Sequence, residues 1–108
     1  MKKPRVILRK CDVYDPTTIQ AIVRDSAEKL GMNIEGKVFI KPNVVSANRK
    51  YIFNSYTHPS VTEGVIGYLK DKGISGITVG ESGGYAIPTR LFLKESGYFD
   101  LARRTGVP

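Results

Sequence analysis

Short apolar runs alternate along the chain with longer segments in which apolar residues recur at helical spacing. Runs of three residues rich in β-branched side chains, bounded by charged residues, proline or glycine, predict short strands. Three segments fit this description: Val6–Leu8, Val38–Ile40 and Ile77–Val79. Apolar residues at every third or fourth position predict helices. These helices are expected from Asp15 to Gly31, from Thr57 to Gly73, from Thr89 to about Glu95, and as a last turn or two over 99–104.

The first predicted helix has the clearest boundaries. Asp15 directly precedes Pro16. An aspartate accepts hydrogen bonds from the free amides of a first helical turn, and a proline suits that turn because it has no amide to leave unpaired. Gly31 follows the last apolar position, Leu30, and glycine readily takes the left-handed conformation that ends many helices.

Strands and helices alternate in the order βαβαβα. This order predicts parallel strands joined by right-handed crossovers, as in a Rossmann-like, three-layer α/β fold. The 108 residues allow one domain, 1–108, and no second one. Three strands are about half of such a sheet, so we expect an open edge. We expect that edge to be completed by sequence following Pro108, as in the N-terminal part of a longer protein, or by self-association.

Charge suggests the kind of partner. The chain has 17 Lys and Arg against 10 Asp and Glu, a formal net charge of +7. Such an excess favours anionic partners, although it also fits an ordinary solvated surface. The single cysteine, Cys11, excludes an internal disulfide and a cluster ligated by this chain alone, and we expect it to be half-buried. No run of apolar residues is long enough for the core of a signal peptide or for a membrane span. This predicts a cytoplasmic protein without a membrane partner.

Polar residues follow the second and third predicted strands and begin the helices after them. Ligands of open parallel sheets bind beside the carboxyl ends of the strands. We therefore expect one site that gathers cationic, acidic, imidazole, amide and hydroxyl groups at this edge. Its candidate residues are Lys41, Asn43, Thr57, His58, Ser60, Glu81, Ser82, Gly83, Gly84, Thr89 and Arg90.

Three of these residues are candidate catalytic groups. Lys41 can neutralise a phosphate or carboxylate, or act as a base if it is desolvated. Glu81 is the best carboxylate candidate for a base or a metal ligand, and His58 has a pKa range that suits proton transfer or metal ligation. Each also has a structural interpretation: Lys41 as an ordinary strand-end lysine, Glu81 as its ion-pair partner, and His58 as a helix cap.

The remaining candidates suit ligand binding. Ser82–Gly84 offers unhindered backbone amides, and Thr89 and Arg90 combine a helix start with a guanidinium group. Asn43 either donates to a ligand or caps a turn. The glycine spacing matches neither a dinucleotide fingerprint, a Walker loop nor a nucleophile elbow, so we do not expect Ser82 to be a nucleophile. The sequence thus predicts binding of a small anionic ligand, with no assigned metal site.

A second interpretation comes from the long segment 44–56. It places Tyr51, Phe53 and Tyr56 beside Arg49 and Lys50, a mixture also found on single-stranded nucleic-acid platforms. No RNA-binding fold signature accompanies the patch, so we do not expect a nucleic-acid partner. A non-catalytic nucleic-acid-binding or protein-docking module stands as the alternative to a ligand-binding domain.

Several of these segments together resemble the uncharacterised family known as domain of unknown function 362. The resemblance rests on five segments in the same order: Val38–Ser46, Thr57–Val65, Ile77–Tyr85, Pro88–Arg90 and Lys94–Tyr98. Members of this family are longer, and many carry ferredoxin-type iron–sulfur modules, so the resemblance implies a redox setting for the full-length protein. With Cys11 as the single cysteine, this chain lacks a cluster-binding motif. A cluster would therefore belong to further sequence or to a partner chain, and the reaction stays open.

Overall fold

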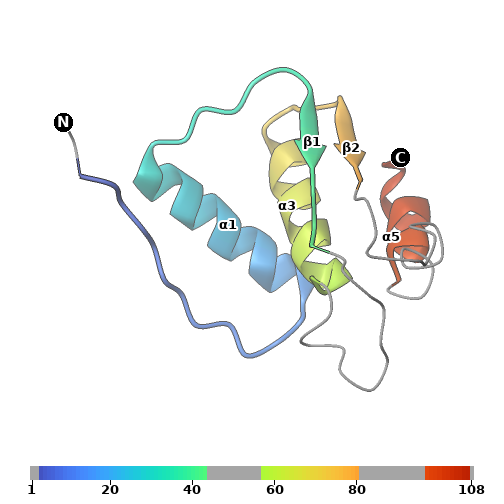
Figure 1. Ribbon diagram of the computed structural model, residues 1–108, viewed down its shortest axis with the longest axis horizontal. Coiled ribbons are helices and arrows are strands. Elements are labelled where there is room, and N and C mark those ends of the chain that lie inside the picture. Colours follow the sequence, from blue (N-terminus) through green and yellow to red (C-terminus); the bar gives the residue numbers. More distant parts are fainter. Residues whose placement is uncertain (1–2, 44–56, 81–96, 108) are drawn as a thin grey trace.

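The computed structural model describes residues 3–43, 57–80 and 97–107 (Figure 1). These residues form three helices and two strands that alternate along the chain. The elements are α1 (Pro16–Leu30), β1 (Val38–Ile40), α3 (Pro59–Asp71), β2 (Ile77–Val79) and α5 (Tyr98–Thr105). The second and third predicted strands, the first two predicted helices and the last helical turns are confirmed. The predicted helix from Thr89 to about Glu95 lies outside the described residues.

Helix α1 begins and ends as the sequence predicts. The Asp15 carboxylate accepts hydrogen bonds from the Thr18 amide at 3.2 Å and the Thr18 hydroxyl at 2.7 Å. These bonds hold the pKa of Asp15 below its ordinary value. At the other end Gly31 has φ +67°, and its amide donates to the Glu28 carbonyl at 3.1 Å. Both ends of the helix are therefore satisfied by local hydrogen bonds.

Strands β1 and β2 form a parallel pair, with Val38 opposite Ile77 and Ile40 opposite Val79. The inward face of the pair packs with the helices on a common core, and it consists of Val38, Ile40, Ile77 and Val79. Phe39, 63% exposed, and Thr78 lie on the other face. Helices pack on only one face of the pair in the described part of the chain. An α/β architecture with parallel pairing is thus observed, while the three-layer Rossmann-like arrangement is not.

Helix α3 lies at the centre of the core. It packs against α1 on one side and α5 on the other. The largest fully buried side chains are Ile66 and Leu69 of α3 and Leu101 of α5. Gly64 allows α1 to approach closely, because a Cβ atom at this position would lie 2.6 Å from Cγ2 of Ile19.

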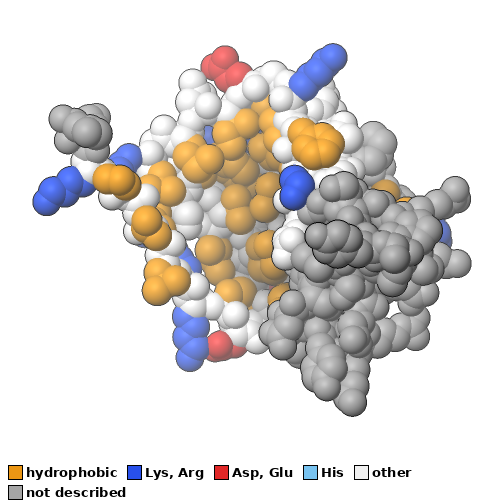
Figure 2. All heavy atoms as spheres, viewed as in Figure 1, with side chains coloured by type: hydrophobic (Ala, Val, Ile, Leu, Met, Phe, Trp, Pro, Cys, Tyr) orange, Lys and Arg blue, Asp and Glu red, His pale blue; other side chains and the backbone are white. Residues whose placement is uncertain are grey.

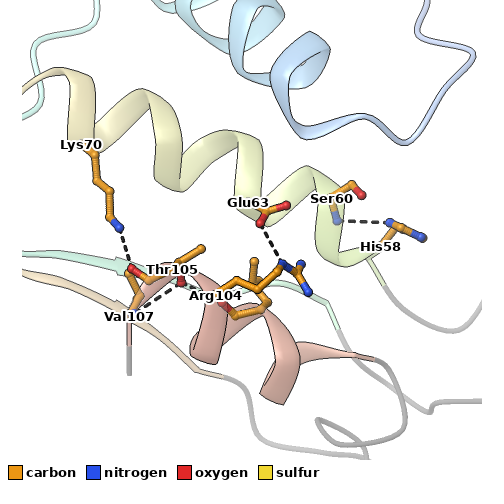
Figure 3. Close-up of polar contacts among 8 residues, drawn as sticks. His58, Ser60, Glu63, Lys70, Arg104, Thr105 and Val107 are labelled. Carbon is orange, nitrogen blue, oxygen red and sulfur yellow. Dashed lines mark hydrogen bonds and ion pairs between the residues drawn. The ribbon is translucent and has the colours of Figure 1, made fainter.

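Two polar contacts also tie α3 to α5 (Figure 3). Nε of Arg104 lies 3.2 Å from the Glu63 carboxylate, and the Lys70 ammonium donates to the Thr105 carbonyl at 2.6 Å. Both pairs join residues more than 30 positions apart. Helix α5 is therefore held by side-chain contacts as well as by apolar packing.

Two predictions for the N-terminal segment are wrong. Residues 6–8 form no strand; Val6 is 88% and Leu8 95% exposed. The segment instead follows α1, because Arg5 donates to the Lys29 and Leu30 carbonyls and a strand needs a neighbour with which to pair. Cys11 is exposed rather than half-buried, and its thiol donates to the carbonyl of Val13 in the same exposed segment at 3.2 Å.

No helix among those that the structure describes combines the length and apolar character needed to cross a membrane.

Candidate functional site

The carboxyl ends of β1 and β2 lie side by side. Ile40 pairs with Val79, and the Gly80 amide donates to the Ile40 carbonyl at 3.0 Å. Lys41 and Gly80 are the next residues along the two strands. The chain therefore leaves both strands at the same edge, as expected for parallel pairing.

A reciprocal pair of hydrogen bonds brings the start of α3 to this edge. The Asn43 amide donates to the Thr57 hydroxyl at 3.2 Å, and the Thr57 amide donates to the Asn43 carbonyl at 2.7 Å. Pro42 between β1 and Asn43 is buried. Residues 43 and 57 thus fix the segment after β1 against the segment before α3, although 13 residues separate them in the chain.

His58 caps α3. Its Nδ1 accepts a hydrogen bond from the Ser60 amide at 3.1 Å (Figure 3). The imidazole stacks on the Tyr14 ring, with 3.9 Å between centroids and 12° between planes. Burial lowers the pKa of His58 from its ordinary value, because desolvation disfavours the imidazolium. The capping contact is observed, and proton transfer by His58 stays a prediction.

Tyr98 supports the site from α5, and the sequence analysis did not find it. Its hydroxyl donates to the Thr57 carbonyl at 2.7 Å and lies 2.8 Å from Oγ1 of Thr62. Tyr98 and Thr62 are both buried. A signal was available in the sequence, because a tyrosine directly after Gly97 at a helix start combines an apolar body with a polar tip that needs a partner when buried.

The structure describes five of the predicted site residues and brings them to one edge. Lys41 and Asn43 follow β1; Thr57, His58 and Ser60 precede or begin α3. Lys41 and Asn43 are exposed, while the other three are partly buried. The other six candidates lie outside the described residues: Glu81, Ser82, Gly83, Gly84, Thr89 and Arg90.

The described residues contain no group of three or more His, Cys, Asp or Glu side chains that could hold a metal ion. A cavity of about 140 Å³ lies between α3, β2 and α5, and it is lined mainly by apolar side chains, among them Ile66, Val79 and Leu101. Such a lining offers little to an anion. The polar edge at Lys41 and Asn43 is therefore the better candidate site for a charged ligand.

The comparison with protein families gives one match. The family model described as "Domain of unknown function (DUF362)" matches residues 38–108, from the first residue of β1 onward. The match includes both strands, α3 and α5, whereas α1 precedes it. No curated protein and no solved structure matches the chain.

Proposed function

The chain belongs to the DUF362 family, and on this premise we propose that it binds a small anionic ligand at the edge where β1 and β2 end. One observation carries the proposal. The two strands end side by side, and the reciprocal Asn43–Thr57 contact holds the start of α3 against them. Polar side chains from separate parts of the chain are thereby held together at the part of a parallel sheet where ligands bind.

The backbone amides of α3 contribute little to this binding. Residue 59 is a proline, the Ser60 amide donates to His58 Nδ1, and the Val61 amide donates to the His58 carbonyl at 3.0 Å. An anion at this edge must therefore be neutralised mainly by side chains. The Lys41 ammonium is the described cation closest in sequence to the Asn43–Thr57 contact, and it is the group to which we assign this role.

The proposed site extends to the residues that follow β2. In this proposal the amides of Ser82–Gly84 surround the ligand, Thr89 and Arg90 add a helix start and a second cation, and Asn43 donates through its side chain. Glu81 or His58 would move a proton if the protein catalyses a reaction. The domain 1–108 would then act as the ligand-binding part of a larger protein.

The residues of this chain do not fit an iron–sulfur cluster. Such clusters are held by several cysteine thiolates. This chain has one cysteine, Cys11, which lies exposed in the segment before α1. Any redox activity that uses a cluster would therefore require cysteines from further sequence or from a partner chain.

Binding can be tested by following backbone amide NMR signals while inorganic phosphate, acetate or citrate is added. We expect shifts at residues 41–43 and 57–60 for at least one anion. Lys41→Ala should weaken that binding by about 10- to 100-fold, because a hydrogen bond to a charged group contributes about 1.5–3 kcal/mol. The matched control is Lys37→Ala, which removes an exposed lysine from the opposite end of β1 and changes the net charge equally.

Two results would contradict the proposal. One is a set of shifts that avoids residues 41–43 and 57–60 with all three anions. The other is equal weakening by Lys41→Ala and Lys37→Ala, because binding would then depend on overall charge and not on the strand ends.

A further inference from the structure

Among the residues that the structure describes, none pairs with β1 on the side away from β2. The Val38 amide donates to the Gly76 carbonyl at 2.8 Å and the Ile40 carbonyl accepts from Gly80, so both residues bond on the side of β2. Successive residues of a parallel strand bond alternately to its two sides. The amide and carbonyl of Phe39 therefore face the other edge, where no residue of the described part forms a strand. Unpaired edges of this kind readily accept another strand.

The same chain carries a segment suited to that edge. We call residues 3–10 the N-terminal arm. At its centre lie Val6, Ile7 and Leu8, whose composition favours a strand. They form no hydrogen bonds with other described backbone groups, and Val6 and Leu8 are 88% and 95% exposed. The arm is therefore an extended segment with an apolar centre and basic ends, and it has no strand partner inside the described part of the molecule (Figure 1).

Contacts with α1 hold the arm away from its own β1. The Arg5 guanidinium donates to the Lys29 and Leu30 carbonyls at 3.2 and 2.7 Å, and Arg9 pairs with Asp25 at 2.6 Å. In Figure 1, α1 lies between the arm and β1. The exposed Val6 and Leu8 are accessible to a second molecule while these contacts persist.

The charges around the arm favour its position on α1 over a position beside its own β1. Lys37 and Lys41 flank β1, and cations at an edge strand discourage pairing with another basic segment. In the held arm, however, Arg9 is neutralised by Asp25, and Arg5 lies at the carbonyl end of α1, where the helix dipole is negative. Lys29, and to a smaller extent Arg9, keeps the pKa of Asp25 below its ordinary value.

We propose that the N-terminal arm of one molecule adds as a strand to the open edge of β1 in a second copy of this chain. Mutual exchange pairs two arms with two edges in one closed, two-fold arrangement. Figure 2 shows hydrophobic side chains gathered in the middle of the face that carries α1 and β1. The exchange covers part of this surface together with Val6, Leu8 and Phe39.

The association state tests this proposal. Sedimentation of the chain over a range of concentrations should show a monomer–dimer equilibrium. The double substitution V6K/L8K should raise the dissociation constant at least tenfold, and because both side chains are exposed the helical circular dichroism should not change. The control is V13K/M32K, which adds the same charge at two other exposed apolar positions, 54% and 51% accessible, and should leave the dissociation constant within about twofold.

Cross-linking identifies the occupant of the edge. In a Cys11→Ser background, one chain carries Leu8→Cys and another, of different length, carries Phe39→Cys. A short bismaleimide should join the two chains. An excess of the Cys11→Ser chain with an unchanged arm should prevent this joining, whereas the same excess of the Cys11→Ser chain with V6K/L8K should prevent it less. A chain that stays monomeric at all concentrations would overturn the proposal, as would a dimer insensitive to V6K/L8K. Cross-linking within single monomers that carry both cysteines would also overturn it, since the arm would then occupy its own β1.

Discussion

His58 has one ring nitrogen committed to the backbone. Its Nδ1 accepts from the Ser60 amide, which requires that this nitrogen carry no proton. Burial lowers the pKa of the imidazole below the ordinary 6.5. The unfolded chain therefore binds a proton more readily than the folded chain, and the stability from this cap is complete above about pH 6.5. It is lost as the pH falls from there toward the lowered pKa of the folded state.

We predict that His58→Asn removes this pH dependence. Asparagine caps helices well and does not titrate, so the free energy of unfolding should stay level between about pH 7.5 and pH 5, whereas that of the original chain falls. His58→Ala should lose about 1 kcal/mol at pH 7.5, because it removes the cap. Urea unfolding at several pH values measures both effects. The lowered pKa values of Asp15 and Asp25 act below about pH 4 and do not interfere.

The same fall in stability for His58→Asn and the original chain would show that another group titrates in this range.

The Tyr98 hydroxyl is the second residue-scale test. Tyr98→Phe removes a donor to the Thr57 carbonyl and a partner of Thr62, both in or beside the buried core. We expect a loss of about 1–3 kcal/mol in the free energy of unfolding, since a buried polar group is left unpaired. Thr62→Val in the Tyr98→Phe background should cost less than Thr62→Val alone. Strict additivity of the two substitutions would contradict the shared hydrogen bond.

At the scale of elements, the close approach of α1 to α3 depends on glycine. A Cβ atom at Gly64 would lie 2.6 Å from Cγ2 of Ile19 and 3.0 Å from the Gln20 backbone nitrogen. A Cβ atom at Gly67 would meet the end of the Gln20 side chain, which can rotate away. The two positions belong to the same helix but face neighbours that differ in their freedom to move.

We therefore predict unequal losses of stability for two identical substitutions. Gly64→Ala should destabilise the protein by about 1–3 kcal/mol, because the steric cost exceeds the roughly 1 kcal/mol that alanine adds to helix propensity. Gly67→Ala should be less destabilising, its main cost being the Gln20–Asp71 hydrogen bond of 2.6 Å. Thermal or urea unfolding of both variants measures the difference. Equal effects would mean that α1 and α3 do not approach each other as closely at Gly64.

At the scale of the whole molecule, α3 joins the other helices. It contacts both α1 and α5, while the arm contacts α1 through two exposed arginines. Elements that are buried and contact several neighbours are the last to unfold locally. We therefore expect α3 to unfold locally last and the arm first.

We predict that amide hydrogen exchange in dilute solution is slowest in α3 and fastest in the arm. Mass spectrometry or NMR can measure both. Protection of the arm should increase with protein concentration if arms are exchanged between copies, and V6K/L8K should abolish that increase. Arm amides as protected as those of α3 in the dilute protein would contradict this organisation.

Local features of the fold could be predicted because they depend on neighbours in the sequence. Asp15, Pro16 and Gly31 determine the ends of α1 through hydrogen bonds and a left-handed φ that involve only nearby residues. The apolar runs of β1 and β2 likewise identify two strands, and their alternation with helices identifies parallel pairing. For the candidate site, this alternation predicted which strand ends meet, and the described contact at that edge joins Asn43 to Thr57.

Other features depend on distant contacts that no local pattern contains. Val6–Leu8 has the composition of a strand, yet Arg5 and Arg9 find better partners on α1, 16 to 25 residues away. Tyr98 reaches Thr57 across 41 positions, and His58 stacks on Tyr14. The sequence by itself therefore determined the three described helices, the two strands and the edge at which both strands end, because short-range sterics and hydrogen bonds suffice for these. Only the tertiary structure decided which groups at that edge are already used by the backbone and which side of β1 has no strand beside it in the described part of the chain, because both depend on packing between remote segments.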